Sequence, residues 1–288
     1  MSVRLISDSA CDLSQSEARE LGVTILPLTI RIDGAEYQDG VTISAKECYE
    51  KLESGMNFPV TRPVSQAAFS EALETMVQAG DEVIIITISE KLSNTAKNAA
   101  IAASKAGGKV WVVDSGSVTI GQNILLRYAI RLRDHGISGS HIASELERAK
   151  PHIRLLFRLD TLRYLMLGGR LSRSSAFLGT IMKVKPVLNV ENGVIQVLGK
   201  ARGTQQSNDM LTEFIPSLGN IDFTMPVIMA CTGEPTVLKE YYDSSKSVWE
   251  GHEDSILTTT IGSTVCTHSG LGAVAVAFFS NEYRLYHW

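Results

Sequence analysis

The sequence is short of cysteine and of excess charge. Four cysteines are spread over 288 residues and form no CxxC pair or dense framework, so we expect reduced thiols rather than disulfides. The formal net charge is only −4. Nucleic acids and anionic membrane surfaces bind to clustered basic faces, so we expect neither as a stable partner.

Long hydrophobic runs are also missing. The longest late apolar run, residues 273–279, is far too short to cross a bilayer. The first residues, MSVRLISDS, do not combine a charged segment with a long apolar one, as a secretory signal does. We therefore expect a cytoplasmic protein with no integral membrane segment, which leaves room for transient membrane contact. A hydrophobic content of 44% is enough for a large core and one or two domains.

The common catalytic motifs are absent. The sequence has no P-loop, because Gly108-Lys109 is followed by Val110, and it has no GxSxG or HExxH motif. Residues 270–275 fit a relaxed dinucleotide fingerprint, but too few residues follow for the required βαβ unit. Cys266 and His268 are potential metal ligands without a second cluster, so we assign neither a metal nor a cofactor.

The first half of the chain alternates strand and helix patterns. Apolar, β-branched segments predict strands at residues 3–6, 23–32, 83–86 and 110–113. Capping residues and helical spacing predict helices after Ser14, Ser44 and Ser65, after residues 93–95, and near 121–134 and 140–149. This alternation predicts a mainly parallel sheet flanked by helices.

The pattern changes beyond Pro151. We expect a strand, a short helix ended by Gly168-Gly169, and a hairpin whose turn contains Asn192-Gly193. The other predicted elements are helices near 174–183, 205–217 and 235–249, a strand at 227–230, and terminal strands in which His268 occupies a glycine-rich bend. The fold class is therefore α/β with two α/β domains, residues 1–152 and residues 153–288, the second with a mixed sheet.

The segment at residues 83–99 carries the clearest binding signal. A continuous apolar strand leads through a polar loop to Ser93, Asn94 and Thr95 at the start of a helix, where unpaired N–H groups attract anions. The simpler alternative is that Ser93 or Asn94 only caps the helix. In a parallel sheet, the turn at residues 7–12, Thr61 and Ser93 would meet beyond the carboxyl ends of the strands.

Several short motifs extend this interpretation to nearly the whole chain. They are SDSACDL at 7–13, TRPVS at 61–65, ISEKLSNTAKNA at 88–99, VDS at 113–115, LGGRLS at 167–172, KVKPVL at 183–188, KARG at 200–203 and HSGLGAVAVAF at 268–278. In their order and spacing the chain resembles the DegV family of bacterial fatty-acid-binding proteins. It departs from the usual family pattern at residues 61–63, with Thr-Arg-Pro for Thr-Ser-Gln-Pro, and at residues 92–95, with Leu-Ser-Asn-Thr for Leu-Ser-Gly-Thr.

The resemblance implies a fold that holds a long-chain fatty acid between two domains. It implies that Thr61, Ser93 and His268 surround the carboxylate, with Asn94 and Thr95 at the adjoining helix start. It also implies a carrier that presents the fatty acid to a separate fatty acid kinase, which makes acyl phosphate for phospholipid synthesis. The chain would then be a binding subunit rather than an enzyme.

Two alternatives remain open. One is a small-molecule hydrolase or phosphotransferase that uses Ser93 and His268, and the other is a scaffold with a small or polar interdomain cleft. Arg170 and Arg202 lie beside glycines and are either ordinary surface charges or residues that dock the kinase. We expect them to face the partner rather than the acyl tail.

Overall fold

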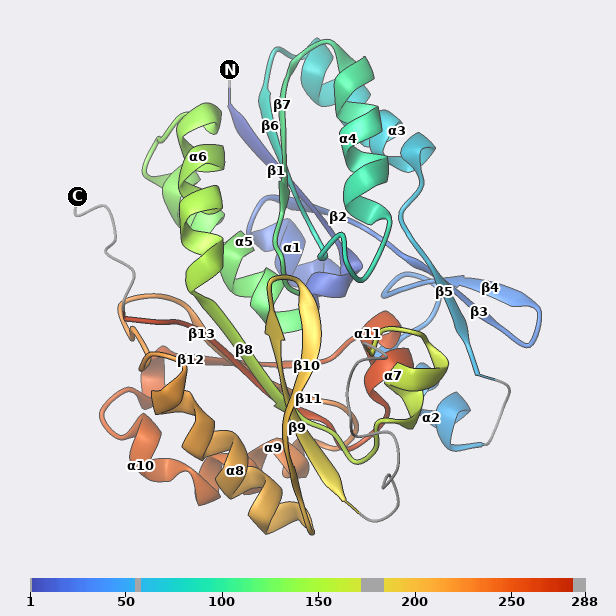
Figure 1. Cartoon of the computed structure of the whole chain (residues 1–288). Coiled ribbons are helices and arrows are strands. Elements are labelled where there is room, and N and C mark those ends of the chain that lie inside the picture. Colours follow the sequence, from blue (N-terminus) through green and yellow to red (C-terminus); the bar gives the residue numbers. More distant parts are fainter. Residues whose placement is uncertain (1, 55–57, 172–183, 282–288) are drawn as a thin grey trace.

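The computed structural model describes residues 2–54, 58–171 and 184–281. Its strands form three sheets, and the largest two lie one above the other in Figure 1. The upper sheet is entirely parallel and the lower one is mixed. A small antiparallel sheet projects to one side.

The four-stranded parallel sheet has the order β2-β1-β6-β7. Its strands are β1 (Val3–Asp8), β2 (Val23–Leu26), β6 (Glu82–Thr87) and β7 (Lys109–Asp114). Every residue of β6 is buried, as expected for a continuous β-branched run covered on both faces. The prediction of a parallel sheet flanked by helices is confirmed.

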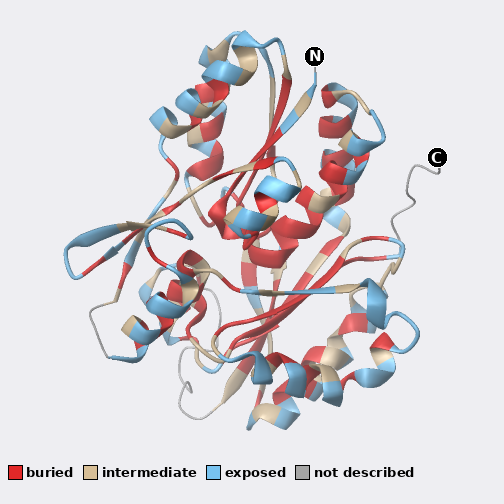
Figure 2. Cartoon of the chain, turned by 180° about the vertical axis from the view of Figure 1, so that it is seen from behind, coloured by how far each residue is buried: buried red, intermediate tan, exposed pale blue. Residues whose placement is uncertain are grey.

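Helices cover both faces of this sheet. Those on one face are α3 (Gln66–Gln78) and α4 (Thr95–Ala106), and those on the other are α5 (Thr119–Asp134) and α6 (Gly139–Ala149) (Figure 1). The short helix α1 (Gln15–Glu20) lies beside β2. Helix α5 is buried over most of its length and contacts both large sheets, so it lies in the centre of the molecule (Figure 2).

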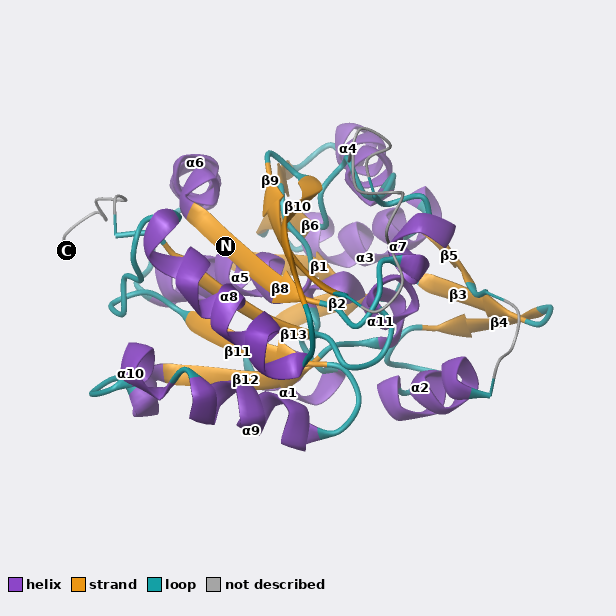
Figure 3. Cartoon of the chain, turned by 60° about the horizontal axis from the view of Figure 1, so that its bottom comes forward, coloured by secondary structure: helices purple, strands orange, loops and turns teal. Residues whose placement is uncertain are grey.

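The six-stranded sheet has the order β10-β9-β8-β13-β11-β12. Its strands are β8 (Ile153–Arg158), β9 (Lys185–Glu191), β10 (Val194–Ala201), β11 (Val227–Cys231), β12 (Ile256–Thr260) and β13 (Val274–Phe279). Only β11 and β12 pair in parallel. Figure 3 shows α8 (Thr204–Ser217), α9 (Pro235–Ser244) and α10 (Lys246–Trp249) along the outer side of this sheet.

The third sheet has the order β4-β3-β5. It comprises β3 (Thr29–Ile32), β4 (Ala35–Gln38) and β5 (Val60–Arg62). Nearby lie α2 (Ala45–Glu53), α7 (Arg163–Leu167) and α11 (Ser263–Ser269), and α11 packs against both other helices and β3 (Figure 1). A late segment of the chain therefore packs against the first half.

One hydrophobic core joins the two large sheets. It contains Leu5 and Ile84 from the parallel sheet, Ile124 from α5, and Leu155 and Ala275 from the six-stranded sheet. All strands of the parallel sheet precede residue 115, and all strands of the six-stranded sheet follow residue 152. The division into domains at residue 152 stays a prediction.

Most of the predicted elements are present, and two details were wrong. The predicted strand at 23–32 is two strands in different sheets, because Pro27 between them has no N–H to continue a ladder. His268 lies on helix α11 rather than in a bend, and Gly270 follows that helix. The helix predicted near 174–183 lies outside the described residues. Within the described ranges, no helix is both long and apolar enough to span a membrane.

Two local predictions from side-chain chemistry are confirmed. Ser44 and Glu47 form a complete capping box at the start of α2. The turn between β9 and β10 has positive φ angles at Asn192 (51°) and Gly193 (78°), the geometry that an Asn-Gly hairpin favours.

Candidate functional site

A pocket lies where the carboxyl ends of the parallel strands meet the inner face of the six-stranded sheet and helix α11. Apolar side chains form most of its wall, among them Ile88, Leu92, Leu155, Phe157, Ile195 and Ala275. The space between its atoms is about 770 Å³, part of it open to solvent, whereas the cavity wide enough for a water molecule is about 80 Å³. The pocket, called the slot below, is therefore tightly lined, with little free space between its walls.

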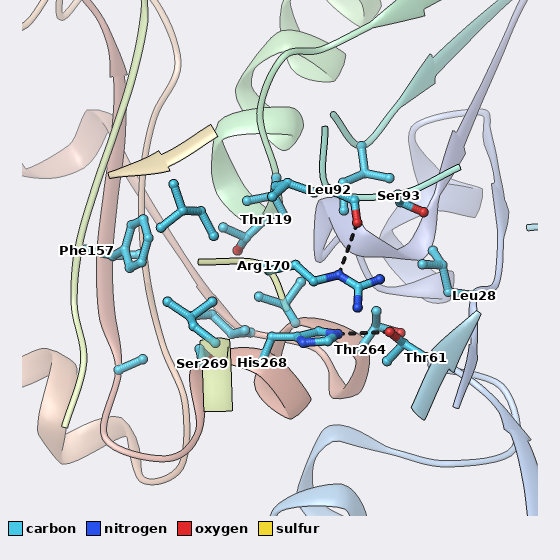
Figure 4. Close-up of a pocket in the computed structure, with 18 of the residues that line it drawn as sticks. Leu28, Thr61, Leu92, Ser93, Thr119, Phe157, Arg170, Thr264, His268 and Ser269 are labelled. Atoms are coloured by element: carbon cyan, nitrogen blue, oxygen red, sulfur yellow. Dashed lines mark hydrogen bonds between the residues drawn. The ribbon is translucent and has the colours of Figure 1, made fainter. Parts of the chain in front are cut away.

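Polar side chains are concentrated at one end of the slot. In Figure 4, Thr61, Ser93 and the guanidinium of Arg170 lie at that end, and Phe157 lies at the opposite end. Thr61 Oγ1 is hydrogen-bonded to His268 Nε2 at 2.9 Å. Four residues from four separate parts of the sequence thus form a polar end on a mostly apolar pocket.

Arg170 brings a positive charge into this polar end. Its Nε donates to the carbonyl of Leu92 at 3.2 Å, and its Nη1 donates to the carbonyl of Gly168. Within the described part of the chain, no carboxylate forms an ion pair with it. Burial lowers the pKa of Arg170, because desolvation disfavours its charged form. An anion in the pocket would supply the missing partner.

His268 is a neutral hydrogen-bonding group in this environment. Burial, together with the charge of Arg170, lowers its pKa from 6.5 to about 3. Its Nδ1 is buried and has no hydrogen-bond partner among the residues that the structure describes. A Cβ atom at Gly168 would lie 2.1 Å from that nitrogen, so only glycine allows α7 to approach the ring this closely.

The helix-start residues divide between structure and pocket. Ser93 Oγ accepts the N–H of Thr95 at 3.3 Å and lies 2.9 Å from Thr95 Oγ1. Asn94 makes no capping bond through its side chain and is exposed, and Thr95 is buried. Of these three residues only Ser93 is among the pocket-lining side chains. Its hydroxyl therefore caps the helix start and also faces the pocket.

The structure brings together most of the residues that the sequence singled out. Thr61, Ser93, His268 and Arg170 all line the pocket, whereas Arg202 is exposed in the loop before α8. The docking role of the two arginines stays a prediction, although Arg170 is placed with its charge toward the pocket.

Sequence reasoning missed the apolar wall and two threonines, Thr119 and Thr264. Thr119 has a φ of +50°, a conformation that no local pattern indicates. The apolar wall residues come from many separate strands, loops and helices between Leu28 and Ala275, so no single periodicity could have identified them.

Two chemical alternatives can be compared with this geometry. His268 Nε2 is bonded to Thr61, and within the described part of the chain it makes no hydrogen bond to Ser93. The nucleophile–base contact of a serine hydrolase is therefore not formed. Among the residues that the structure describes, no group of three or more acidic, histidine or cysteine side chains is arranged to hold a metal ion.

Comparisons with known proteins agree with this architecture. A family model described as "Uncharacterised protein, DegV family" matches residues 2–281. A DegV domain-containing protein of Deinococcus radiodurans is 35% identical over 282 residues, covering 96% of this chain and 98% of the relative.

Two solved structures are similar over nearly their whole length. One, described as showing fatty acid binding of a DegV family protein from Thermus thermophilus, has a TM-score of 0.84 and 27% identity and covers 97% of this chain and 100% of its own. The other is a stearic acid-binding protein from Eubacterium ventriosum, with a TM-score of 0.85, 25% identity, and coverage of 98% and 99%. Because the family model matches almost every residue and the fold is shared throughout, this chain belongs to the DegV family.

Proposed function

We propose that this chain binds a long-chain fatty acid in the pocket, with the carboxylate at the polar end and the acyl chain along the apolar wall. The observation that carries this proposal is the guanidinium of Arg170, which lies at one end of a mostly apolar slot and has no acidic partner among the described residues. An amphipathic anion has the matching chemistry. The fatty-acid-binding relatives named above support the same ligand class.

The acyl chain supplies most of the affinity in this proposal. Transferring roughly 14 methylene groups from water into the pocket is worth on the order of 11 kcal/mol before ordering costs, at about 0.8 kcal/mol each. The apolar wall extends from Leu28 and Leu92 to Phe157, which is the direction an extended chain would follow (Figure 4). Because the slot has little free space, its side chains would move apart slightly as the chain enters.

The carboxylate is recognised by a small set of donors. Arg170 offers a charged group and Ser93 offers a hydroxyl. The bonded pair of Thr61 and neutral His268 offers one further hydrogen: His268 Nδ1 donates it when Nε2 accepts the Thr61 hydroxyl, and Thr61 donates it when Nε2 carries the hydrogen. A neutral histidine adds no second positive charge, and Arg62, which also lines the pocket, is already paired with Glu36 at 2.7 Å. Arg170 would therefore be the cation that meets the carboxylate.

The finer role we propose is that of a carrier. The chain would present the carboxylate to a separate fatty acid kinase, which forms acyl phosphate for phospholipid synthesis, and would itself use no cofactor. Arg170 and the exposed Arg202 could then meet the negative charge of the approaching phosphate. The missing contact between Ser93 and His268 favours this role over hydrolysis.

Native mass spectrometry of freshly purified protein tests the ligand assignment. We expect a complex with one long-chain fatty acid, identified after organic extraction. Arg170→Glu should lose much of this lipid by charge repulsion, whereas Arg202→Glu, a matched reversal on the surface, should retain it. A polypeptide mass alone, with no fatty acid in the extract, would contradict the proposal.

A further inference from the structure

Three carboxylates are buried beside the pocket without lining it. These are Asp8, Asp12 and Asp39, and each of these residues is at most 6% exposed to solvent. Within the described part of the chain none of them forms an ion pair with a lysine, arginine or histidine. Burial raises the pKa of all three, Asp8 to about 7. Burying acids without cationic partners lowers the stability of the fold. Residues that lower stability are expected where they serve a function.

Each carboxylate holds a segment that does line the pocket. Asp8 accepts the N–H of Ile88 at 2.8 Å, and Ile88 is part of the apolar wall. Asp12 accepts the hydroxyl of Thr119, another wall residue. The three acids therefore bond to the back of the wall rather than to its inner surface.

Asp12 and Asp39 converge on the start of helix α11. Asp12 Oδ1 accepts the N–H of Gly262 at 2.9 Å, and Asp39 Oδ1 accepts the N–H of Ser263 at 3.1 Å. A Cβ atom at Gly262 would lie 2.9 Å from Asp12 Oδ1, so the close approach depends on glycine. Two consecutive backbone donors of this helix are thus bound by acids from the first half of the chain.

Asp39 is in turn hydrogen-bonded to Ser9. The Ser9 hydroxyl donates to Asp39 Oδ2 at 2.9 Å and accepts the N–H of Leu28 at 3.0 Å. Leu28 also lines the pocket. One side-chain network therefore connects two separate parts of the pocket wall.

Helix α11 needs such external support. It has only seven residues, Ser-Thr-Val-Cys-Thr-His-Ser, all of low helix propensity, and isolated helices of this length are unstable. It carries Thr264, His268 and Ser269 into the pocket (Figure 4). Acids at its first N–H groups satisfy unpaired donors and the positive end of the helix dipole.

We propose that Asp12 and Asp39 are positioning residues for the fatty-acid site, holding α11 so that His268 lies beside Thr61 and Arg170. The inference rests on the proposed function for its ligand, but the placement of His268 can be measured without lipid. The acids act through α11 and touch neither the head group nor the tail.

Glu82 provides a matched control. It is 8% exposed, and its Oε2 accepts the N–H of Gly139, the first residue of α6, at 2.7 Å. It therefore holds a helix start as Asp39 does, although it also pairs with Lys109 at 3.0 Å, and no residue of α6 lines the pocket. Glu82→Ala should destabilise the protein without changing the ligand site.

The experiment combines calorimetric titration with stearic acid and NMR of the histidine side chains, with the His268 signal assigned from His268→Gln. We expect Asp39→Ala and Asp12→Ala each to weaken stearic acid binding roughly tenfold, the effect of about one hydrogen bond. Both should shift the His268 imidazole signals. Asp39→Asn keeps an acceptor oxygen and should restore most of the affinity, and Glu82→Ala should stay within about twofold of wild type.

Three results would overturn the proposal: unchanged affinity in folded Asp39→Ala, an equal loss in Glu82→Ala, or His268 signals that do not move. If the alanine variants do not fold, Ser9→Ala decides the question by the same readouts, because it removes the hydroxyl that holds Asp39: unchanged affinity and unmoved His268 signals in that variant would overturn the proposal. If wild type binds no stearic acid, the proposed function fails, while the His268 signals still decide whether the acids position the ring.

Discussion

Replacing Arg170 with glutamine should weaken binding of a fatty acid much more than binding of the corresponding fatty alcohol. Glutamine keeps a donor for the carbonyl of Leu92 or Gly168 but removes the positive charge. The alcohol has the same tail and no charge, so it reports any general damage to the pocket. The difference between the two ligands isolates the pairing of guanidinium and carboxylate.

The size of the effect follows from the surroundings of Arg170. Two unit charges 4 Å apart attract by about 4 kcal/mol at an effective dielectric constant near 20, which is a ceiling. Hydrogen bonds to charged groups contribute about 1.5–3 kcal/mol net, so the fatty acid should lose roughly 10- to 150-fold in affinity. The fatty alcohol should lose less than about threefold.

Titration calorimetry with stearic acid and stearyl alcohol measures both affinities. Arg202→Gln is the matched control, because that side chain is exposed and outside the pocket lining. The lipid-free Arg170→Gln variant should not unfold at a markedly lower temperature, since the substitution removes a desolvated charge that has no carboxylate partner in the described part of the chain. Equal losses for acid and alcohol, or no loss for the acid, would refute the assignment of Arg170 to the carboxylate.

Four further predictions follow from the same geometry. Ser93→Ala should weaken fatty-acid binding by roughly 1–3 kcal/mol, whereas Ser65→Ala, which removes the cap of α3, should lower stability and leave affinity unchanged; the reverse pattern would make Ser93 only a cap. The pKa of His268 is lowered from 6.5 to about 3, so the native state resists its protonation. The unfolded state therefore binds more protons between those values, and wild type should lose stability relative to His268→Gln as the pH falls below 6.5; parallel pH profiles would contradict this. Gly168→Ala should displace His268 and reduce affinity, while Gly108→Ala, whose Cβ would meet Val77 at 2.6 Å far from the pocket, should affect only the melting temperature. Arg202→Ala should keep its fatty acid but slow acyl-phosphate formation by a cognate kinase, with a loss that worsens as salt increases; unchanged kinetics would make Arg202 an ordinary surface charge.

Much of the fold could be predicted because its signals are local. The β-branched run of β6 predicts a strand buried on both faces, Ser44 with Glu47 predicts a helix start, and Asn192-Gly193 predicts a hairpin. Each of these signals depends on residues within a few positions of one another. The break at Pro27 was not predicted, but it has a local signal as well, because a proline has no N–H group to donate to the neighbouring strand.

The sequence also determined the candidates for the polar end of the pocket. Thr61, Ser93 and His268 were chosen from motif positions, and all three line the pocket, with Thr61 bonded to His268. The sequence could not indicate that distance, because 207 residues separate the two side chains. It could equally not choose between a cap and a pocket residue for Ser93, since its hydroxyl does both.

Only the tertiary structure decided what surrounds these residues. Arg170 follows two glycines and reads as a surface charge, yet the packing of α7 against α11 places its guanidinium in the pocket. Helix α11 has a sequence with no helical signal, and it forms where Asp12 and Asp39 reach its first N–H groups from more than 200 residues away. Local propensity depends on neighbours along the chain, whereas charge pairing and burial depend on which distant segments come into contact. Those contacts form only when the two large sheets pack around α5.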